Sequence, residues 1–113
     1  MDEQSLKSCC ELLQIAGEVR SAAAQALAAA RSAQFEEADR RLLEAEHRLD
    51  DARALQLGML QTEAQGAQEP CSLLLVHAND HIMLAETACE STREYISLYR
   101  AIDALKRSAE KPE

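Results

Sequence analysis

The sequence predicts an all-α fold, an antiparallel up-down-up bundle of three long helices. Apolar residues recur at spacings of three and four over most of the chain, as is typical of amphipathic helices. No segment alternates polar and apolar residues with period two, so we expect no strands. The 113 residues correspond to one domain, with helices predicted at about 4–31, 35–62 and 71–106.

Two apolar stripes that are out of phase predict the first two helices. The first stripe comprises Leu12, Ala16, Val19, Ala23, Ala26 and Ala30, and the second comprises Phe35, Ala38, Leu42, Ala45, Leu49 and Ala52. One continuous heptad pattern would place Glu37 and Glu44 inside the bundle, so the chain must break near 32–34 although no Gly or Pro marks the break. Ser32 is the expected N-cap of the second helix.

The third helix follows a polar connection, TEAQGAQEP (62–70). Gly66 can end the second helix, and Pro70 suits the first turn of the third. The expected buried stripe of the third helix comprises Leu84, Ala88, Tyr95, Leu98, Ile102 and Leu105. Extended backward in steps of four and three, this stripe reaches Asp80 and His77. We therefore expect His77, Asp80 and His81 to share one face that packs toward other helices.

Composition restricts the choice of partners. The chain has 20 acidic and 12 basic residues, a formal charge of -8 and no Lys/Arg cluster, so nucleic acid and anionic membranes are poor partners and a basic protein is a better one. Much of the apolar content is Ala, so one chain buries little area and self-association would relieve that shortage. The longest apolar run, 22–30, is too short to span a bilayer, and the N-terminus, MDEQSLK, lacks a signal-peptide layout. We expect a cytoplasmic protein.

The four cysteines are expected to be reduced, buried small hydrophobes. They are Cys9, Cys10, Cys71 and Cys89, and no CxxC motif is present. Adjacent cysteines form no easy mutual disulfide, so we assign no redox or metal function to them.

Three interpretations of the histidine cluster are open. His77 and His81 could be core histidines hydrogen-bonded to a neighbouring acid. They could bind a metal, although zinc usually takes three or four ligands and His47, the remaining histidine, is predicted on the outward side of the second helix. An imidazole could also act as a nucleophile that accepts a phosphoryl group, with Asn79 as a nearby hydrogen-bond donor. Because no phosphate-binding glycine loop is present, such a protein would be a carrier that another protein phosphorylates.

The segment LLLVHANDHIM (73–83) resembles the third-helix motif of the lactose/cellobiose-type enzyme IIA of the bacterial phosphoenolpyruvate-dependent sugar phosphotransferase system, roughly L-V-H-A-Q-D-H-x-M. Three further segments resemble other parts of the family. The segment AGEVRSAAAQALAAARSAQFEEADR (16–40) resembles the family's passage from the first to the second helix. The segments EAEHRLDDARALQ (44–56) and TEAQG (62–66) resemble its second helix and the loop that follows. The resemblance covers nearly the whole chain and implies one enzyme IIA domain over 1–113. Departures from the family pattern are Ala33, Gln34, the doubled Arg40–Arg41, Arg53 and Asn79.

The resemblance implies a role for each residue of the motif. His77 matches the phosphorylated histidine, which would become a tele-phosphohistidine, and His81 and Asn79 would support it. Asp80 matches an aspartate on the threefold axis of a homotrimer. That aspartate can bind a divalent metal ion, here expected to be one Mg²⁺ per trimer because Mg²⁺ prefers oxygen ligands. No organic cofactor is implied.

The function implied is that of a cytoplasmic phosphotransferase component with no direct membrane insertion. His77 would accept a phosphoryl group from the histidine-containing phosphocarrier protein and pass it to a cysteine of enzyme IIB during sugar uptake. The sugar stays open among lactose, cellobiose, chitobiose and others, as does a regulatory role without transport. The alternative is a non-catalytic helical oligomer in which His77, Asp80 and His81 are structural or bind metal.

Overall fold

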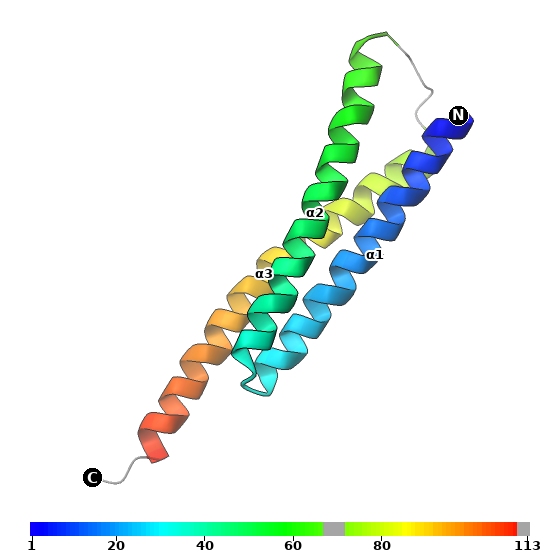
Figure 1. The fold of residues 1–113 in the computed structure, drawn as a ribbon. Coiled ribbons are helices and arrows are strands. Elements are labelled where there is room, and N and C mark those ends of the chain that lie inside the picture. Colours follow the sequence, from blue (N-terminus) through cyan, green and yellow to red (C-terminus); the bar gives the residue numbers. More distant parts are fainter. Residues whose placement is uncertain (67–71, 111–113) are drawn as a thin grey trace.

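A computed structural model describes residues 1–66 and 72–110. It contains three helices, α1 (Glu3–Arg31), α2 (Phe35–Ala64) and α3 (Leu73–Glu110), and these described residues contain no strand. Figure 1 shows α1 and α3 running in the same direction and α2 running antiparallel to both, which confirms the predicted up-down-up topology. Helix α3 extends to Glu110, beyond the predicted end near 106, whereas Pro70 and Cys71 lie outside the described residues.

The bundle is a rod of 71 × 19 × 19 Å. Its length comes mainly from α3, which continues past the turn between α1 and α2 (Figure 1). Across residues 1–66 and 72–110, no helix is both long and apolar enough to cross a membrane.

The turn at 32–34 confirms the predicted break but corrects its cap. The backbone N–H of Ser32 donates to the Ala29 carbonyl at 3.1 Å, so Ser32 caps the C-terminus of α1. Ala33 then takes a left-handed conformation with φ 58°, and α2 begins after Gln34 without a side-chain capping bond. The prediction that Ser32 caps α2 is therefore wrong, because the backbone N–H of Ser32 donates to the last carbonyls of α1. Gly66 ends α2 as predicted, with φ 97° and its N–H donating to the Glu63 carbonyl.

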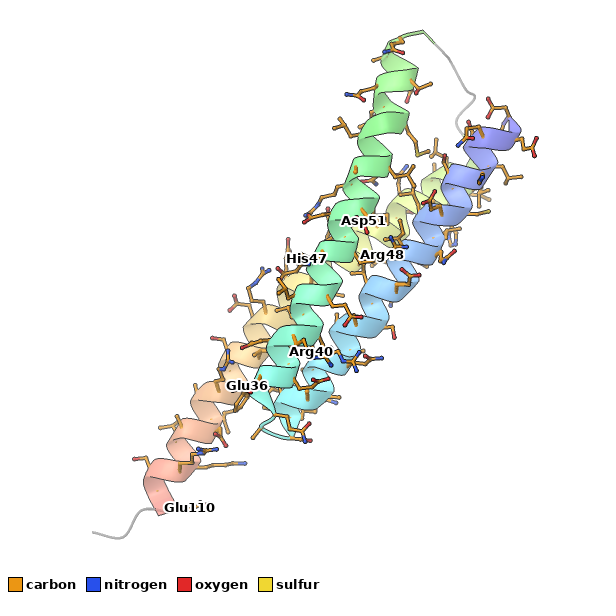
Figure 2. All side chains as sticks on the ribbon, viewed as in Figure 1. Glu36, Arg40, His47, Arg48, Asp51 and Glu110 are labelled. Carbon is orange, nitrogen blue, oxygen red and sulfur yellow. The ribbon has the colours of Figure 1, made fainter. Side chains whose placement is uncertain are left out.

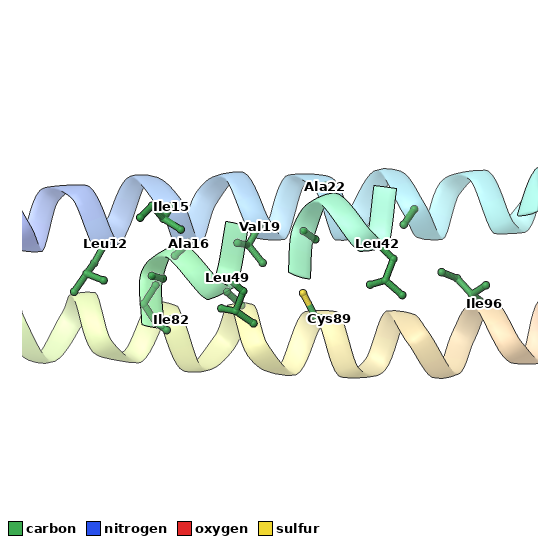
Figure 3. Packing of buried hydrophobic residues seen from close by; sticks show 14 of the residues in the cluster. Leu12, Ile15, Ala16, Val19, Ala22, Leu42, Leu49, Ile82, Cys89 and Ile96 are labelled. Atoms are coloured by element: carbon green, nitrogen blue, oxygen red, sulfur yellow. The ribbon is translucent and has the colours of Figure 1, made fainter. Parts of the chain in front are cut away.

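One thin apolar core runs along the bundle axis (Figure 3). The stripes predicted for the first two helices are confirmed, since all of their members except the half-buried Phe35 are buried. The largest fully buried side chains are Leu12, Ile15, Val19, Ile82 and Cys9. Much of the remaining core is Ala, which lets the helix axes approach closely but buries little area per residue.

The stripe predicted for α3 is not the one that packs within the chain. The face of α3 in the core comprises Ala78, Ile82, Ala85, Cys89, Thr92 and Ile96. The predicted stripe is exposed instead, from 45% at Ile102 to 71% at Leu105, apart from the half-buried Ala88. Helix α3 carries two apolar stripes, and periodicity alone does not say which one faces α1 and α2.

The cysteines divide between the core and the surface. Cys9 and Cys89 are buried free thiols, and in both cases desolvation by burial raises the pKa. Cys10 is exposed, so the prediction of burial is wrong for this residue, which lies on the outer side of α1. Cys71 lies outside the described residues.

Candidate functional site

His77 and His81 form a contacting pair near the N-terminal end of α3. Their ring centroids are 4.4 Å apart and their planes meet at 72°, an edge-to-face arrangement. The four-residue spacing places both rings on one side of the helix. His77 is exposed and His81 is half-buried. The exposed ring is therefore accessible to a partner, while the contact with His81 restricts its rotation.

Asp80 lies on the exposed side of α3, near His77 and in line with Leu73 and Leu84. Within the described ranges, Asp80 has no ion-pair partner. The same ranges contain no group of three His, Cys, Asp or Glu side chains that could hold a metal ion. A metal site built by a single chain is therefore absent from the described part of the molecule.

Asn79 faces away from His77. Residues two apart in a helix point to different sides, and the Asn79 Oδ1 accepts a hydrogen bond from Gln56 Nε2 of α2 at 2.8 Å. Both side chains are half-buried. The structure thus connects Asn79 to α2 and does not bring its amide beside the His77 ring. Sequence reasoning missed Gln56, although it occupies the next position of the α2 stripe after Ala52.

Charged side chains surround the bundle without contacting His77. Arg53 Nε pairs with Glu86 Oε1 at 3.2 Å, and two further pairs, Glu46–Arg93 and Asp39–Arg100, also join α2 to α3. Between α1 and α2, hydrogen bonding to Arg48 lowers the pKa of Glu18. These pairs are largely solvent-exposed, so each contributes little to stability.

His47 occupies the outward side of α2, as predicted. Figure 2 shows it along the same helix as Arg48 and Asp51. These three residues line an open groove between α1 and α2. His47 therefore does not supplement the His77–His81 pair.

The fold and the histidine motif define a class of protein. The family model for "PTS system, Lactose/Cellobiose specific IIA subunit" matches residues 7–100, and the chain belongs to this family. The resemblance predicted from the 73–83 motif is thereby confirmed.

Relatives with assigned names are similar over most of the chain. The lichenan-specific phosphotransferase enzyme IIA component of Bacillus subtilis (strain 168) is 37% identical over 102 residues, which is 90% of this chain and 93% of that protein. The lactose-specific EIIA component of Lactococcus lactis subsp. lactis is 34% identical over 80% of this chain and 86% of its own length.

Solved structures share the fold. The cellobiose-specific enzyme IIA from Bacillus anthracis superposes with a TM-score of 0.87 at 34% identity, over 92% of this chain and 95% of that one. The IIA(chitobiose) of Escherichia coli, solved in a complex with HPr, gives a TM-score of 0.79 at 27% identity, over 91% of this chain and 99% of that one. The three-helix bundle is therefore the fold of this family.

Proposed function

We propose that this sugar-specific IIA component is a phosphocarrier whose acceptor is His77. The observation that carries the proposal is the exposed His77 ring in edge contact with His81, within the VHANDH motif of a family member. A nucleophilic imidazole needs access to its partner and a restricted orientation, and this arrangement offers both. The chain would act in the cytoplasm, between a phosphoryl donor and the sugar-importing machinery.

The chemistry requires two successive displacements at phosphorus. A ring nitrogen of neutral His77 attacks the phosphoryl group of a phosphohistidine donor, and the electron pair of the breaking P–N bond returns to the donor imidazole. We assign the attack to the tele nitrogen, Nε2, since it lies farthest from the backbone on an exposed ring. A cysteine thiolate of enzyme IIB then attacks phosphorus, and the P–N pair returns to His77.

The donor is proposed to be the histidine-containing phosphocarrier protein. The related chitobiose protein was solved in a complex with HPr, and the net charge of -8 favours a basic partner surface. The relatives are named for different sugars, including lichenan, lactose and cellobiose, so their names do not select a sugar for this chain.

We also propose that three chains assemble around Asp80. The exposed apolar stripe of α3 offers a surface for other copies, and Asp80 is a charged residue on that side without an ion partner in the described ranges. Three carboxylates around one axis repel each other, so a shared cation or protonation is required. Three oxygen donors suit a hard divalent ion such as Mg²⁺, one per trimer, which would neutralise the axis.

The non-catalytic alternative has less support. A structural histidine pair would be buried and hydrogen-bonded, whereas the His77 ring is exposed. A metal site within one chain also lacks support, because the described residues contain no group of three His, Cys, Asp or Glu side chains that could hold a metal ion.

The direct test is phosphorylation in a reconstituted system. The purified chain, mixed with phosphoenolpyruvate and the general phosphotransferase proteins, should gain one phosphate per chain that is labile to acid and stable to base. Addition of a cognate enzyme IIB should then remove this phosphate and phosphorylate a IIB cysteine. A chain that takes up no phosphate under these conditions would contradict the proposal.

A further inference from the structure

A polar ladder runs along the contact between α2 and α3. Its ion pairs recur one heptad apart on each of the two antiparallel helices: Asp39–Arg100, Glu46–Arg93 and Arg53–Glu86. In chain order, both helices change from acidic to basic: α2 carries Asp39, Glu46 and then Arg53, and α3 carries Glu86, Arg93 and then Arg100. A slip of one heptad would place Glu46 opposite Glu86, or Arg53 opposite Arg93. The charges therefore specify one register, although each exposed pair adds little stability.

The heptad spacing of the ladder does not continue to the end of the α2–α3 contact that carries His77. Continuation of the heptad spacing would pair Leu60 with Asn79, yet Leu60 is 62% exposed and Asn79 bonds to Gln56, one turn earlier on α2. Figure 1 shows the C-terminal part of α2 diverging from α3 in this region. Among residues 1–66 and 72–110, the hydrogen bond between Gln56 and Asn79 is therefore the last polar connection between α2 and α3 before the two helices separate.

Gln56 interrupts an apolar pattern. The buried stripe of α2 steps from Leu49 to Ala52, and its next positions are Gln56 and the partly buried Met59. An apolar side chain would extend the core at 56. In helical bundles, a polar residue at such a position can specify register at a cost in stability. A polar contact that specifies the register is needed more here, because the neighbouring core residues, such as Ala52 and Ala78, are too small to interlock strongly.

We propose that Gln56 is a positioning residue for phosphoryl transfer, an inference that rests on the proposed function of His77. Its bond to Asn79 fixes the rotation and axial position of the α3 segment that presents the histidine. A slip of α3 by one residue would turn the His77 direction by about 100° and shift it by about 1.5 Å. Gln56 contacts neither His77 nor the transferred group, so it acts only through Asn79.

The test replaces the polar residue with the apolar one that the stripe would otherwise carry. Gln56→Leu should keep the fold and its melting temperature, or raise that temperature, while kcat for transfer from the phosphocarrier protein to His77 falls about tenfold with KM within about twofold. A purely structural role predicts the reverse, a lower melting temperature and an unchanged kcat for the folded protein. The imidazole NMR signals of His77 should also shift in Gln56→Leu without any phosphoryl donor.

Two variants control the experiment. Gln61→Leu makes the same exchange at an exposed position of α2 and should leave kcat unchanged. The swap Gln56→Asn/Asn79→Gln restores an amide pair and should recover kcat to within about threefold. Wild-type kcat in Gln56→Leu, or no recovery in the swap, would overturn the inference. Failure of the wild-type chain to take up phosphate would instead contradict the proposed function, and the NMR comparison still tests the position of His77.

Discussion

The two apolar faces of α3 differ in the size of their side chains and in their exposure to solvent. The face that packs on α1 and α2 uses mostly small or medium side chains: Ala78, Ile82, Ala85, Cys89, Thr92 and Ile96. The outer face carries larger ones that remain exposed: Leu84, Tyr95, Leu98, Ile102 and Leu105. Small residues allow close packing within the chain, and the larger exposed residues form the surface that the proposed trimer would use. The inner face thus makes the fold, and the outer face, which also carries Asp80, is suited to assembly.

The largest effect should follow from a charge on the inner face. Ile82 is 1% exposed, and Ile82→Asp would bury a carboxylate without a partner. We expect the free energy of unfolding to fall by at least about 3 kcal/mol, measured by urea denaturation followed by circular dichroism. The matched outer-face variant, Leu105→Asp, should keep the helical signal. Equal losses in the two variants would remove the distinction between the faces.

A charge on the outer face should separate the chains without unfolding them. Leu98 is 58% exposed in the single chain, so Leu98→Asp leaves the intrachain core intact. In the proposed trimer it would place three carboxylates in an apolar contact. Sedimentation equilibrium should show a trimer for the wild type and mainly monomer for the variant, with similar helicity. An unchanged trimer would show that this stripe is not the assembly surface.

Asp80 should make the trimer conditional. Replacing Asp80 with Leu removes the repulsion among three carboxylates, and we expect a trimer tighter by about 1–4 kcal/mol in chelator. Mg²⁺ should strengthen the wild-type assembly and have little effect on Asp80→Leu. Sedimentation with EDTA and with Mg²⁺ measures both effects. A wild-type trimer indifferent to metal and pH, or a monomeric variant, would place Asp80 away from the axis.

The cysteines offer a smaller contrast between buried and exposed positions. Cys89→Ser puts a hydroxyl into the core and should lower the free energy of unfolding by about 1–2 kcal/mol, whereas Cys10→Ser should change it by less than about 0.5 kcal/mol. Burial raises the pKa of Cys89, so a thiol reagent should modify Cys10 before Cys89 in the native protein. Both variants should still accept phosphate. Loss of phosphorylation in a folded Cys→Ser variant would assign a thiol to the chemistry.

The smallest effect is expected for the pH dependence of stability at the contact between α1 and α2, where Glu18 pairs with Arg48. Hydrogen bonds from Arg48 and Gln14 lower the pKa of Glu18, so the stability that this carboxylate adds is present above its unfolded pKa and is lost as pH falls through the folded value. Arg48→Ala should raise the Glu18 pKa toward its ordinary value, measured by NMR titration of the side-chain carbonyl. The trimer should be unaffected. An unchanged Glu18 pKa would show that the ion pair does not persist in solution.

The apolar periodicity of the sequence was sufficient to predict three helices. It also predicted the buried faces of α1 and α2, because each of these two helices has one apolar stripe. It was insufficient for α3, since Leu84 and Ile82 both belong to apolar stripes and periodicity does not rank them. Ser32 has the side chain of an N-cap, but the left-handed Ala33 after it ends α1 there. Gln56 gave only a weak signal, a polar residue in an apolar stripe, and its contact with Asn79 requires the packed helices.

The site itself was predicted mainly by its motif. The spacing of His77 and His81 indicated a shared side of the helix, and their ring contact agrees with that prediction. Exposure of His77 was not predictable, because it depends on which stripe of α3 the core uses. Asn79 carries a donor, but its orientation toward α2 follows from packing.

Locating the phosphate among the three histidines tests the central claim most directly. His77→Gln, His81→Gln and His47→Gln would each be incubated with phosphoenolpyruvate and the general phosphotransferase proteins, and phosphate uptake would be followed by intact mass at neutral pH. We expect no uptake in His77→Gln, slower but complete uptake in His81→Gln, and the wild-type rate in His47→Gln, with all three proteins helical. Wild-type phosphorylation of His77→Gln would contradict the assignment of His77 as the phosphoryl acceptor.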